Sequence, residues 1–286
     1  MGWTLLAIVA FIVVIAIASN LDQSRAEKQK RKKAEEDRAF YNRVLEQQKI
    51  ALQENQRQVE AQHREKSRAF NAELLRIPKV DIVLSDGLQD LTNWDDFPSD
   101  QLSIINPRTG ARKSLYADFT IVDVETTGLD KYSEIIELSA IKYVNFEPVS
   151  CFSTLVKPSG TIPLKITQIT HIDASMVSNA PTINQIMPAF IEYIGNDNIL
   201  GHNLSFDLKF LYKSGFDCFA KKRRYYDTLK IARSHLSKDM IENHKLTTLC
   251  DYYNISRDDA HRSLSDCFAT GKVYQSLLKW YSFKDE

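Results

Sequence analysis

The chain falls into four regions that differ in their pattern of apolar and polar positions. Residues 3–19 are almost wholly apolar and carry no charge, whereas residues 22–76 are rich in Glu, Gln, Lys, Arg and Ala and contain neither Gly nor Pro. Residues 77–116 have short apolar runs broken by Pro and Gly. From about residue 117, short apolar runs alternate with amphipathic segments, which is typical of an α/β domain. We therefore divide the chain into residues 1–21, 22–76, 77–116 and 117–286.

The apolar amino-terminal run predicts a membrane anchor. Extended to Leu21, it reaches the roughly 20 residues that a spanning helix needs. Several basic residues follow between Arg25 and Lys33, and positive charge beside a span tends to stay on the cytoplasmic side. We expect a single-pass membrane protein whose remaining chain lies in the cytoplasm. A cleaved signal peptide is the alternative, because Ala16 to Ala18 match the small-x-small cleavage pattern.

Residues 22–76 predict one or two long charged helices, since their residue types favour helix. Leu45, Leu52 and Val59 recur every seven residues, as in a coiled coil, but Gln48 and Asn55 occupy the complementary core positions. A single spacer helix is therefore favoured over a homodimer formed through this stem. Residues 77–116 predict short strands and turns, as a linker or a small accessory segment.

Charge and cysteine content add little to this division. The net charge is zero, so the composition as a whole does not indicate nucleic-acid binding, although an enzyme gripping a strand end can be locally basic. The cysteines are scattered and show no zinc-ligand spacing, so we expect reduced, partly buried thiols. They are Cys151, Cys218, Cys250 and Cys267.

The carboxy-terminal region predicts a mixed sheet with helices on both faces. Strands at 119–124, 134–144 and 150–157 are expected to form an antiparallel meander, and strands near 198–200 and 223–226 to complete the sheet. A long last helix has apolar residues spaced for packing on this sheet. These are Leu264, Phe268, Val273, Leu277 and Leu278.

Acidic residues interrupt this apolar pattern at three places. Asp123 and Glu125 lie two apart on a strand and so share one face. Two acids at the end of an apolar strand are costly unless a cation neutralises them, and oxygen ligands suit Mg²⁺ or Mn²⁺. Asp207 is expected in the first turns of a helix. Asp266 is expected near the start of the last helix, with His261 in the preceding loop or first turn.

In order, these residues give Asp-x-Glu, then Asp, then His-x4-Asp, a set that resembles the DEDDh exonucleases. This family includes the proofreading subunit of bacterial replicative DNA polymerase, RNase T and oligoribonuclease. The resemblance covers about residues 117–280. It is carried also by the segments Val124–Leu129, Ile135–Ile141, Gly201–Asn203 and Tyr226–Leu229, and by Ile169–Ile172, where His171 stands in place of the common Gly. His261, with Arg262 rather than Tyr before Asp266, indicates the histidine branch.

The resemblance implies a ribonuclease H-like fold and a metal-dependent 3′→5′ exonuclease that releases nucleoside 5′-monophosphates. The implied carboxylate shell of two Mg²⁺ or Mn²⁺ ions is Asp123, Glu125, Asp207 and Asp266, with His261 as general base. The implied substrate-binding residues are Thr126, Thr127, Gly128, Leu129, His202, Asn203 and Phe206. For Leu129 and Phe206, ordinary core packing is the alternative.

The expected partner is a nucleic acid with a 3′ end, with DNA favoured over RNA. The basic and aromatic cluster Lys221–Tyr226 is a further candidate for phosphate binding, although short basic loops are more often simply solvated. Two other functions stay open: an exoribonuclease or oligoribonuclease, and a catalytically silent membrane-tethered protein that binds nucleic acid. The silent protein is disfavoured, because all five catalytic positions are filled.

Overall fold

The fold is that of a computed structural model, which describes residues 2–86, 93–99, 102, 104–219, 222–257 and 261–283. Side chains of residues 1–9 and 12 lie outside this description. The chain divides into two compact units, Met1–His63 and Arg64–Glu286, and each is described by itself.

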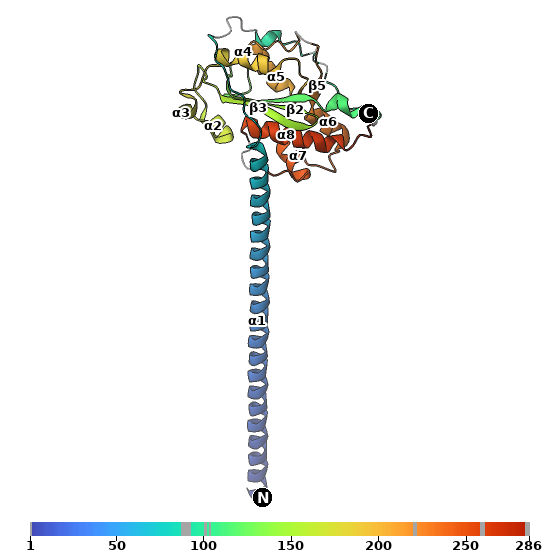
Figure 1. The fold of residues 1–286 in the computed structure, drawn as a ribbon. Coiled ribbons are helices and arrows are strands. Elements are labelled where there is room, and N and C mark those ends of the chain that lie inside the picture. Colours follow the sequence, from blue (N-terminus) through green and yellow to red (C-terminus); the bar gives the residue numbers. More distant parts are fainter. Residues whose placement is uncertain are drawn as a thin grey trace. The chain divides into compact units, whose positions relative to one another are not determined.

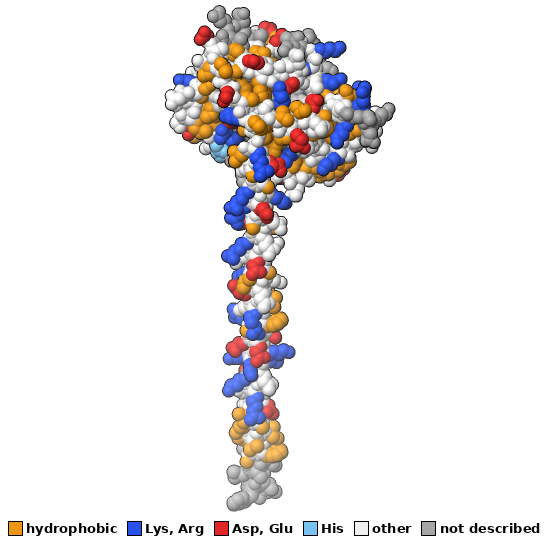
Figure 2. All heavy atoms as spheres, in the orientation of Figure 1, with side chains coloured by type: hydrophobic (Ala, Val, Ile, Leu, Met, Phe, Trp, Pro, Cys, Tyr) orange, Lys and Arg blue, Asp and Glu red, His pale blue; other side chains and the backbone are white. Residues whose placement is uncertain are grey.

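A single helix, α1 (Gly2–Leu74), makes up the first unit and continues into the second (Figure 1). The long amino-terminal helix is thus confirmed, and it is uninterrupted because no helix-breaking Pro lies in it. Lys and Arg side chains are interspersed with Asp and Glu along this helix beyond its apolar first turns (Figure 2). Within the described residues, no helix is apolar over a length sufficient to cross a membrane. The expected anchor, residues 1–21, lies partly outside the described side chains.

The second unit is built on a five-stranded sheet in the order β3-β2-β1-β4-β5. β1 pairs antiparallel with β2, and β2 with β3, whereas β4 is parallel to both β1 and β5. This confirms the mixed sheet and its meander. The strands are β1 (Phe119–Thr126), β2 (Ile135–Val144), β3 (Glu147–Leu155), β4 (Ile199–Gly201) and β5 (Tyr225–Asp227).

Helices cover both faces of the sheet, as expected (Figure 1). On one side, α6, α7 and α8 pack against Phe119 and Ile121 of β1; on the other, α4 and α5 pack against Val122 and Val124. This alternation follows from the two-residue period of a strand. The helices are α2 (Leu164–Thr170), α3 (Ala174–Val177), α4 (Ile183–Ile194), α5 (Ser205–Lys213), α6 (Thr228–His235), α7 (Leu246–Tyr252) and α8 (Ser263–Leu278).

The last helix, α8, lies especially close to the sheet. A Cβ atom at Gly271 would collide with the hydroxyl of Tyr143 on β2, so only glycine allows this approach. Of the five apolar residues expected on this helix, four are buried and Leu264 is half-buried. All four cysteines are free and buried, as predicted.

The segment between α1 and β1 runs along both edges of the sheet. Val80 N donates to Cys151 O of β3 at 2.9 Å, and Ile105 N donates to Tyr225 O of β5 at 2.8 Å. Exposed edge strands present unpaired backbone groups, and such pairing covers them. The segment also holds two short 3₁₀ turns, η1 (Trp94–Asp96) and η2 (Lys113–Tyr116); residues 87–92, 100, 101 and 103 lie outside the described residues.

Candidate active site

The strand β1 carries two carboxylates on the face that is covered by α8. Phe119 and Ile121 face α8, so Asp123 and Glu125 continue the same alternation where the apolar run ends. Both are half-buried.

Asp207 joins this pair from α5, where it is buried in the first turn. The pairing of β1 with β4 includes only Thr120 and Ile121, so the backbone of β1 beyond them lacks a strand partner on this side. The Asp207 carboxylate takes that place and accepts a hydrogen bond from Val124 N at 3.1 Å. The end of the short strand β4 therefore positions Asp207 beside the β1 acids.

His261 and Asp266 come from the beginning of α8. His261 is exposed in the loop before the helix, with a left-handed φ of 65°, and Asp266 is buried in the first turn. Potential ligand atoms of Glu125, His261 and Asp266 lie within 4.8 Å of one another. The structure thus brings residues from distant parts of the chain together at one end of the sheet.

Burial and mutual repulsion raise the pKa values of these carboxyl groups. Burial first, and then the charges of Asp207 and Asp266, raise the pKa of Asp123 well above its ordinary value. Burial raises the pKa of Asp207 to about 8, and burial with the charge of Asp266 raises that of Glu125 to about 8. Burial also raises the pKa of Asp266, against the opposing charge of Arg257, with which it forms an ion pair.

The mutual repulsion of these buried carboxylates indicates whether the site suits divalent cations. Carboxylates held this close remain unfavourable when ionised unless a cation lies among them. Carboxylate oxygens are also the donors that Mg²⁺ and Mn²⁺ prefer. The donor set of Asp123, Glu125, Asp207 and Asp266 therefore fits the implied ions.

Glu137 is a buried member of the site that the sequence analysis did not single out. It lies on β2 directly opposite Glu125 and accepts hydrogen bonds from Arg262 Nη2 at 2.6 Å and from Ser263 N at 2.8 Å. The only sequence signal is its position as the single charge in the apolar run Ile135–Ile141. Glu137 thereby ties the sheet to the residues between His261 and Asp266.

The turn after β1 is held by its own hydrogen bonds. Thr126 Oγ1 donates to Gly128 O at 2.6 Å, and Thr127 Oγ1 accepts from Glu134 N at 2.9 Å. A Cβ at Gly128 would lie 2.6 Å from Ser133 Oγ, so any larger residue here would have to displace that hydroxyl. Leu129 beyond it is 80% exposed, which excludes core packing as its role.

His202 and Asn203 follow β4. His202 Nδ1 hydrogen-bonds Thr228 Oγ1 at 2.9 Å, and burial lowers its pKa to about 4. Asn203 has a φ of 62°, and its N–H donates to Asp227 Oδ1 at 3.0 Å. Phe206, in contrast, is half-buried and packs on Phe210 with ring centroids 5.0 Å apart.

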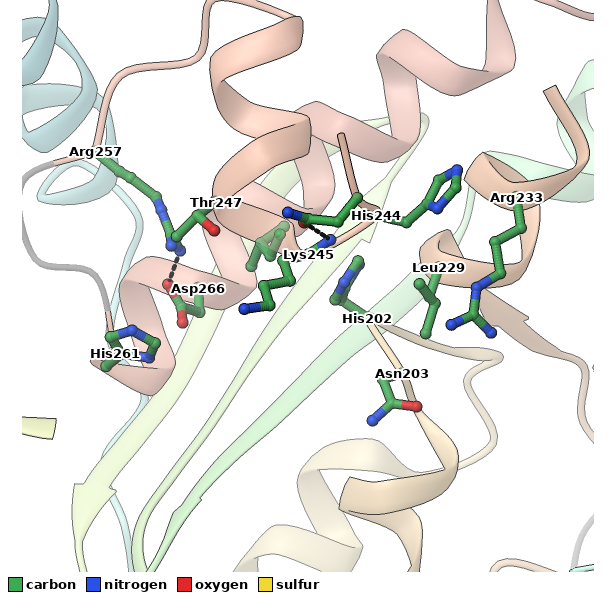
Figure 3. Close-up of a pocket in the computed structure, with 12 residues that line it drawn as sticks. His202, Asn203, Leu229, Arg233, His244, Lys245, Thr247, Arg257, His261 and Asp266 are labelled. Atoms are coloured by element: carbon green, nitrogen blue, oxygen red, sulfur yellow. Dashed lines mark hydrogen bonds and ion pairs between the residues drawn. The ribbon is translucent and has the colours of Figure 1, made fainter. Parts of the chain in front are cut away.

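A pocket of about 640 Å³ opens beside the acids (Figure 3). Four of the expected site residues line it, and the others come from α6, α7 and the loops around α7, which the sequence analysis did not identify. Its wall is formed by His202, Asn203, Leu229, Arg233, Asn243, His244, Lys245, Leu246, Thr247, Arg257, His261 and Asp266.

The basic cluster at residues 221–226 does not belong to this end of the sheet. The parallel strands β1, β4 and β5 place the acids at their carboxyl ends, whereas Arg223 and Arg224 precede the first residue of β5. Arg223 Nη2 donates to Gly195 O at 3.1 Å, and Lys221 lies outside the described residues.

Comparisons with known proteins match the region of the chain that contains these residues. Residues 120–274 match the RNase T exonuclease family model. The DNA polymerase III subunit epsilon of Aquifex aeolicus is 31% identical over 169 residues, which are 58% of this chain and 83% of that protein. The PolC-type DNA polymerase III of Clostridium perfringens is 36% identical over 172 residues, which are 59% of this chain but only 12% of that polymerase.

A solved structure of exonuclease I has the same fold. It superposes with a TM-score of 0.52 at 18% identity, over 58% of this chain and 41% of that one. With the match to the family model and the relation to the epsilon subunit, the chain belongs to the RNase T exonuclease family, through a domain of the DEDDh 3′→5′ type.

Proposed function

We propose that this protein hydrolyses the last phosphodiester bond at the 3′ end of a nucleic acid and releases a nucleoside 5′-monophosphate. The observation that carries the proposal is the convergence of Glu125, His261 and Asp266 within 4.8 Å, next to Asp123 and Asp207. We further propose DNA rather than RNA as the substrate, because the epsilon and PolC-type relatives are parts of DNA polymerase III.

The acidic residues of the site would hold two divalent ions, Mg²⁺ or Mn²⁺. When bound, such ions stabilise charge on the phosphate and on the leaving 3′ oxygen. The chain provides Asp123, Glu125, Asp207 and Asp266 to hold them. His261, exposed beside Glu125, accepts the proton of the attacking water, since an imidazole can take up a proton near neutral pH.

The turn from Thr126 to Leu129 receives the terminal nucleotide. Its internal hydrogen bonds fix the backbone. The exposed Leu129 side chain is available to pack against the last base. His202 and Asn203 line the pocket beside the acids.

We also propose that residues 1–21 attach the protein to a membrane, with the nuclease domain in the cytoplasm. The support is the uncharged run 3–19 and the basic residues that follow it. In this proposal residues 22–63 of α1 act as a single spacer helix, and a homodimer through the stem is the alternative.

The test of the nuclease function is hydrolysis of end-labelled single-stranded DNA and RNA by the full chain, first with Mg²⁺ and then with EDTA. Asp123→Asn and Glu125→Gln should each lower the rate by at least about 100-fold, because each removes an ion ligand. Asp251→Asn, an exposed acid on α7, is the matched control and should retain full activity. Unchanged hydrolysis in EDTA, or in Asp123→Asn, would refute the proposal.

A further inference from the structure

Among the charged side chains that line the pocket beside the acids, cations outnumber carboxylates. Arg233, Lys245 and Arg257 contribute side-chain cations, and Asp266 is its one carboxylate. Arg257 already pairs with Asp266, so the remaining charge of the wall is that of Arg233 and Lys245.

These two cations have no acidic partner in the described part of the chain. Other basic residues do, such as Lys131 with Asp95 at 2.9 Å and Lys142 with Asp197 at 3.0 Å. In the view of Figure 3, the Arg233 and Lys245 head groups lie on opposite sides of His202. They come from α6 and from the N-cap of α7.

His202 is another member of the pocket wall. Burial is the main cause that lowers the pKa of its imidazole to about 4; a hydrogen bond with the His244 backbone opposes this shift, and the charges of Arg257 and Arg233 add to it. Its ring stays neutral, so it adds a hydrogen-bonding group to the wall without adding charge.

The geometry points to a phosphate group as the ligand of this pocket. Its volume of about 640 Å³ is in the usual range of about 300–1,000 Å³ for small-molecule sites. Because Asp266 and His261 form one wall, an anion bound here is directly beside the reaction site. We propose that Arg233 and Lys245 bind a phosphate of the nucleic-acid substrate; this proposal rests on the proposed function.

The test is binding of a 5′-labelled single-stranded DNA to the full chain in EDTA, measured by fluorescence anisotropy. Arg233→Gln and Lys245→Gln should each raise the Kd by about 10-fold. Each should also reduce the salt dependence of log Kd by about 0.7, the value for one lost phosphate contact on a single strand. Lys238→Gln is the matched control, because Lys238 is exposed on the same α6–α7 connection but is not part of the pocket wall.

Competition by a nucleoside 5′-monophosphate distinguishes two sources of the phosphate. If the inhibition constant of the monophosphate rises in Arg233→Gln and Lys245→Gln, the pocket holds the phosphate of the released nucleotide. If these variants lose affinity only for the oligonucleotide, the pocket holds a phosphodiester of the remaining strand. Either result supports the pocket as a phosphate site.

The proposal is overturned if both variants bind DNA as Lys238→Gln does, or if the unmodified chain binds no DNA. Hydrolysis in Mg²⁺ is measured separately on the unmodified chain. A protein that binds DNA through Arg233 and Lys245 but does not cleave it would refute the nuclease function alone, and an active nuclease with unaffected variants would refute the pocket alone.

Discussion

Single residues of the acid cluster link the stability of the domain to pH. Glu125 and Asp207 have ordinary pKa values of 4.5 and 3.8, and burial raises both to about 8 in the folded, metal-free domain. At pH values between the ordinary and the raised pKa, the folded chain holds protons that the unfolded chain has released. The stability from these groups is therefore complete below about pH 4 and is lost as the pH rises through about 8.

In EDTA, the Tm of the protein should fall as the pH is raised from about 6 to about 9. With Mg²⁺ the fall should be smaller, because the cation binds the ionised carboxylates and releases their protons. Differential scanning fluorimetry measures both series. Asp207→Asn should flatten the EDTA series, since the amide does not titrate. Identical slopes with and without Mg²⁺ would show that no ion binds these acids.

Glu137 gives a second prediction for a single residue. Glu137→Gln should lower the free energy of unfolding by about 1–3 kcal/mol, because a hydrogen bond to a buried charged group is lost. The partial exposure of Arg262 lets its guanidinium regain water, which limits the loss. The kcat should also fall, because Glu137 positions the residues between His261 and Asp266. Urea unfolding and steady-state kinetics measure the two effects.

Glu147→Gln on β3 is the control, since Glu147 is exposed. If Glu137→Gln resembles it in both stability and kcat, Glu137 does not support the site. The acids at 123, 125, 207 and 266 could be identified from the sequence because their types and order carry the chemistry. Glu137 could not, because its partner Arg262 is 125 positions away, and nothing in either local pattern predicts that contact.

Whole elements were predictable to the extent that local pattern determines them. The strands and the packing face of α8 follow from apolar periodicity, and the continuity of α1 from the absence of Pro. The path of residues 78–80 and 104–105 along the two sheet edges could not be predicted. It depends on backbone hydrogen bonds to Cys151 and Tyr225, and every residue type except proline can donate such bonds.

The last turns of α1 are part of the nuclease unit and contact α8. The Phe70 ring is 4% exposed and lies 4.9 Å, between centroids, from the ring of Phe268. Ser67 Oγ lies 2.8 Å from Ser256 Oγ, and Lys66 Nζ donates to Asn254 Oδ1 at 2.7 Å. In each of these contacts, a residue of α1 outside the region that matches the family model meets a residue inside that region.

Phe70→Ala should therefore destabilise the nuclease domain by about 3–5 kcal/mol, the usual loss for a buried aromatic ring. Leu52→Ala, on the same helix but 59% exposed, should change stability by no more than about 0.5 kcal/mol. Chemical denaturation followed by tryptophan fluorescence compares the two. Equal stability of both variants would mean that the end of α1 does not pack on α8 in solution.

At the scale of the whole molecule, the start of α1 carries an exposed apolar surface outside the region matched by the exonuclease family, which spans residues 120–274. In the first turns of α1 with described side chains, Phe11, Ile15 and Ile17 are 65%, 52% and 55% exposed. Exposed apolar patches of this kind mark a surface that contacts lipid or another protein.

Deleting residues 2–21 should therefore separate attachment from catalysis. The full chain should sediment with lipid vesicles, and the deletion variant should remain in the supernatant while cleaving DNA at the same rate, because every proposed ion ligand lies beyond residue 119. If the full chain also remains in the supernatant, the membrane proposal fails. Light scattering would then show whether two copies cover the apolar residues of α1 by pairing, as the seven-residue spacing of Leu45, Leu52 and Val59 allows.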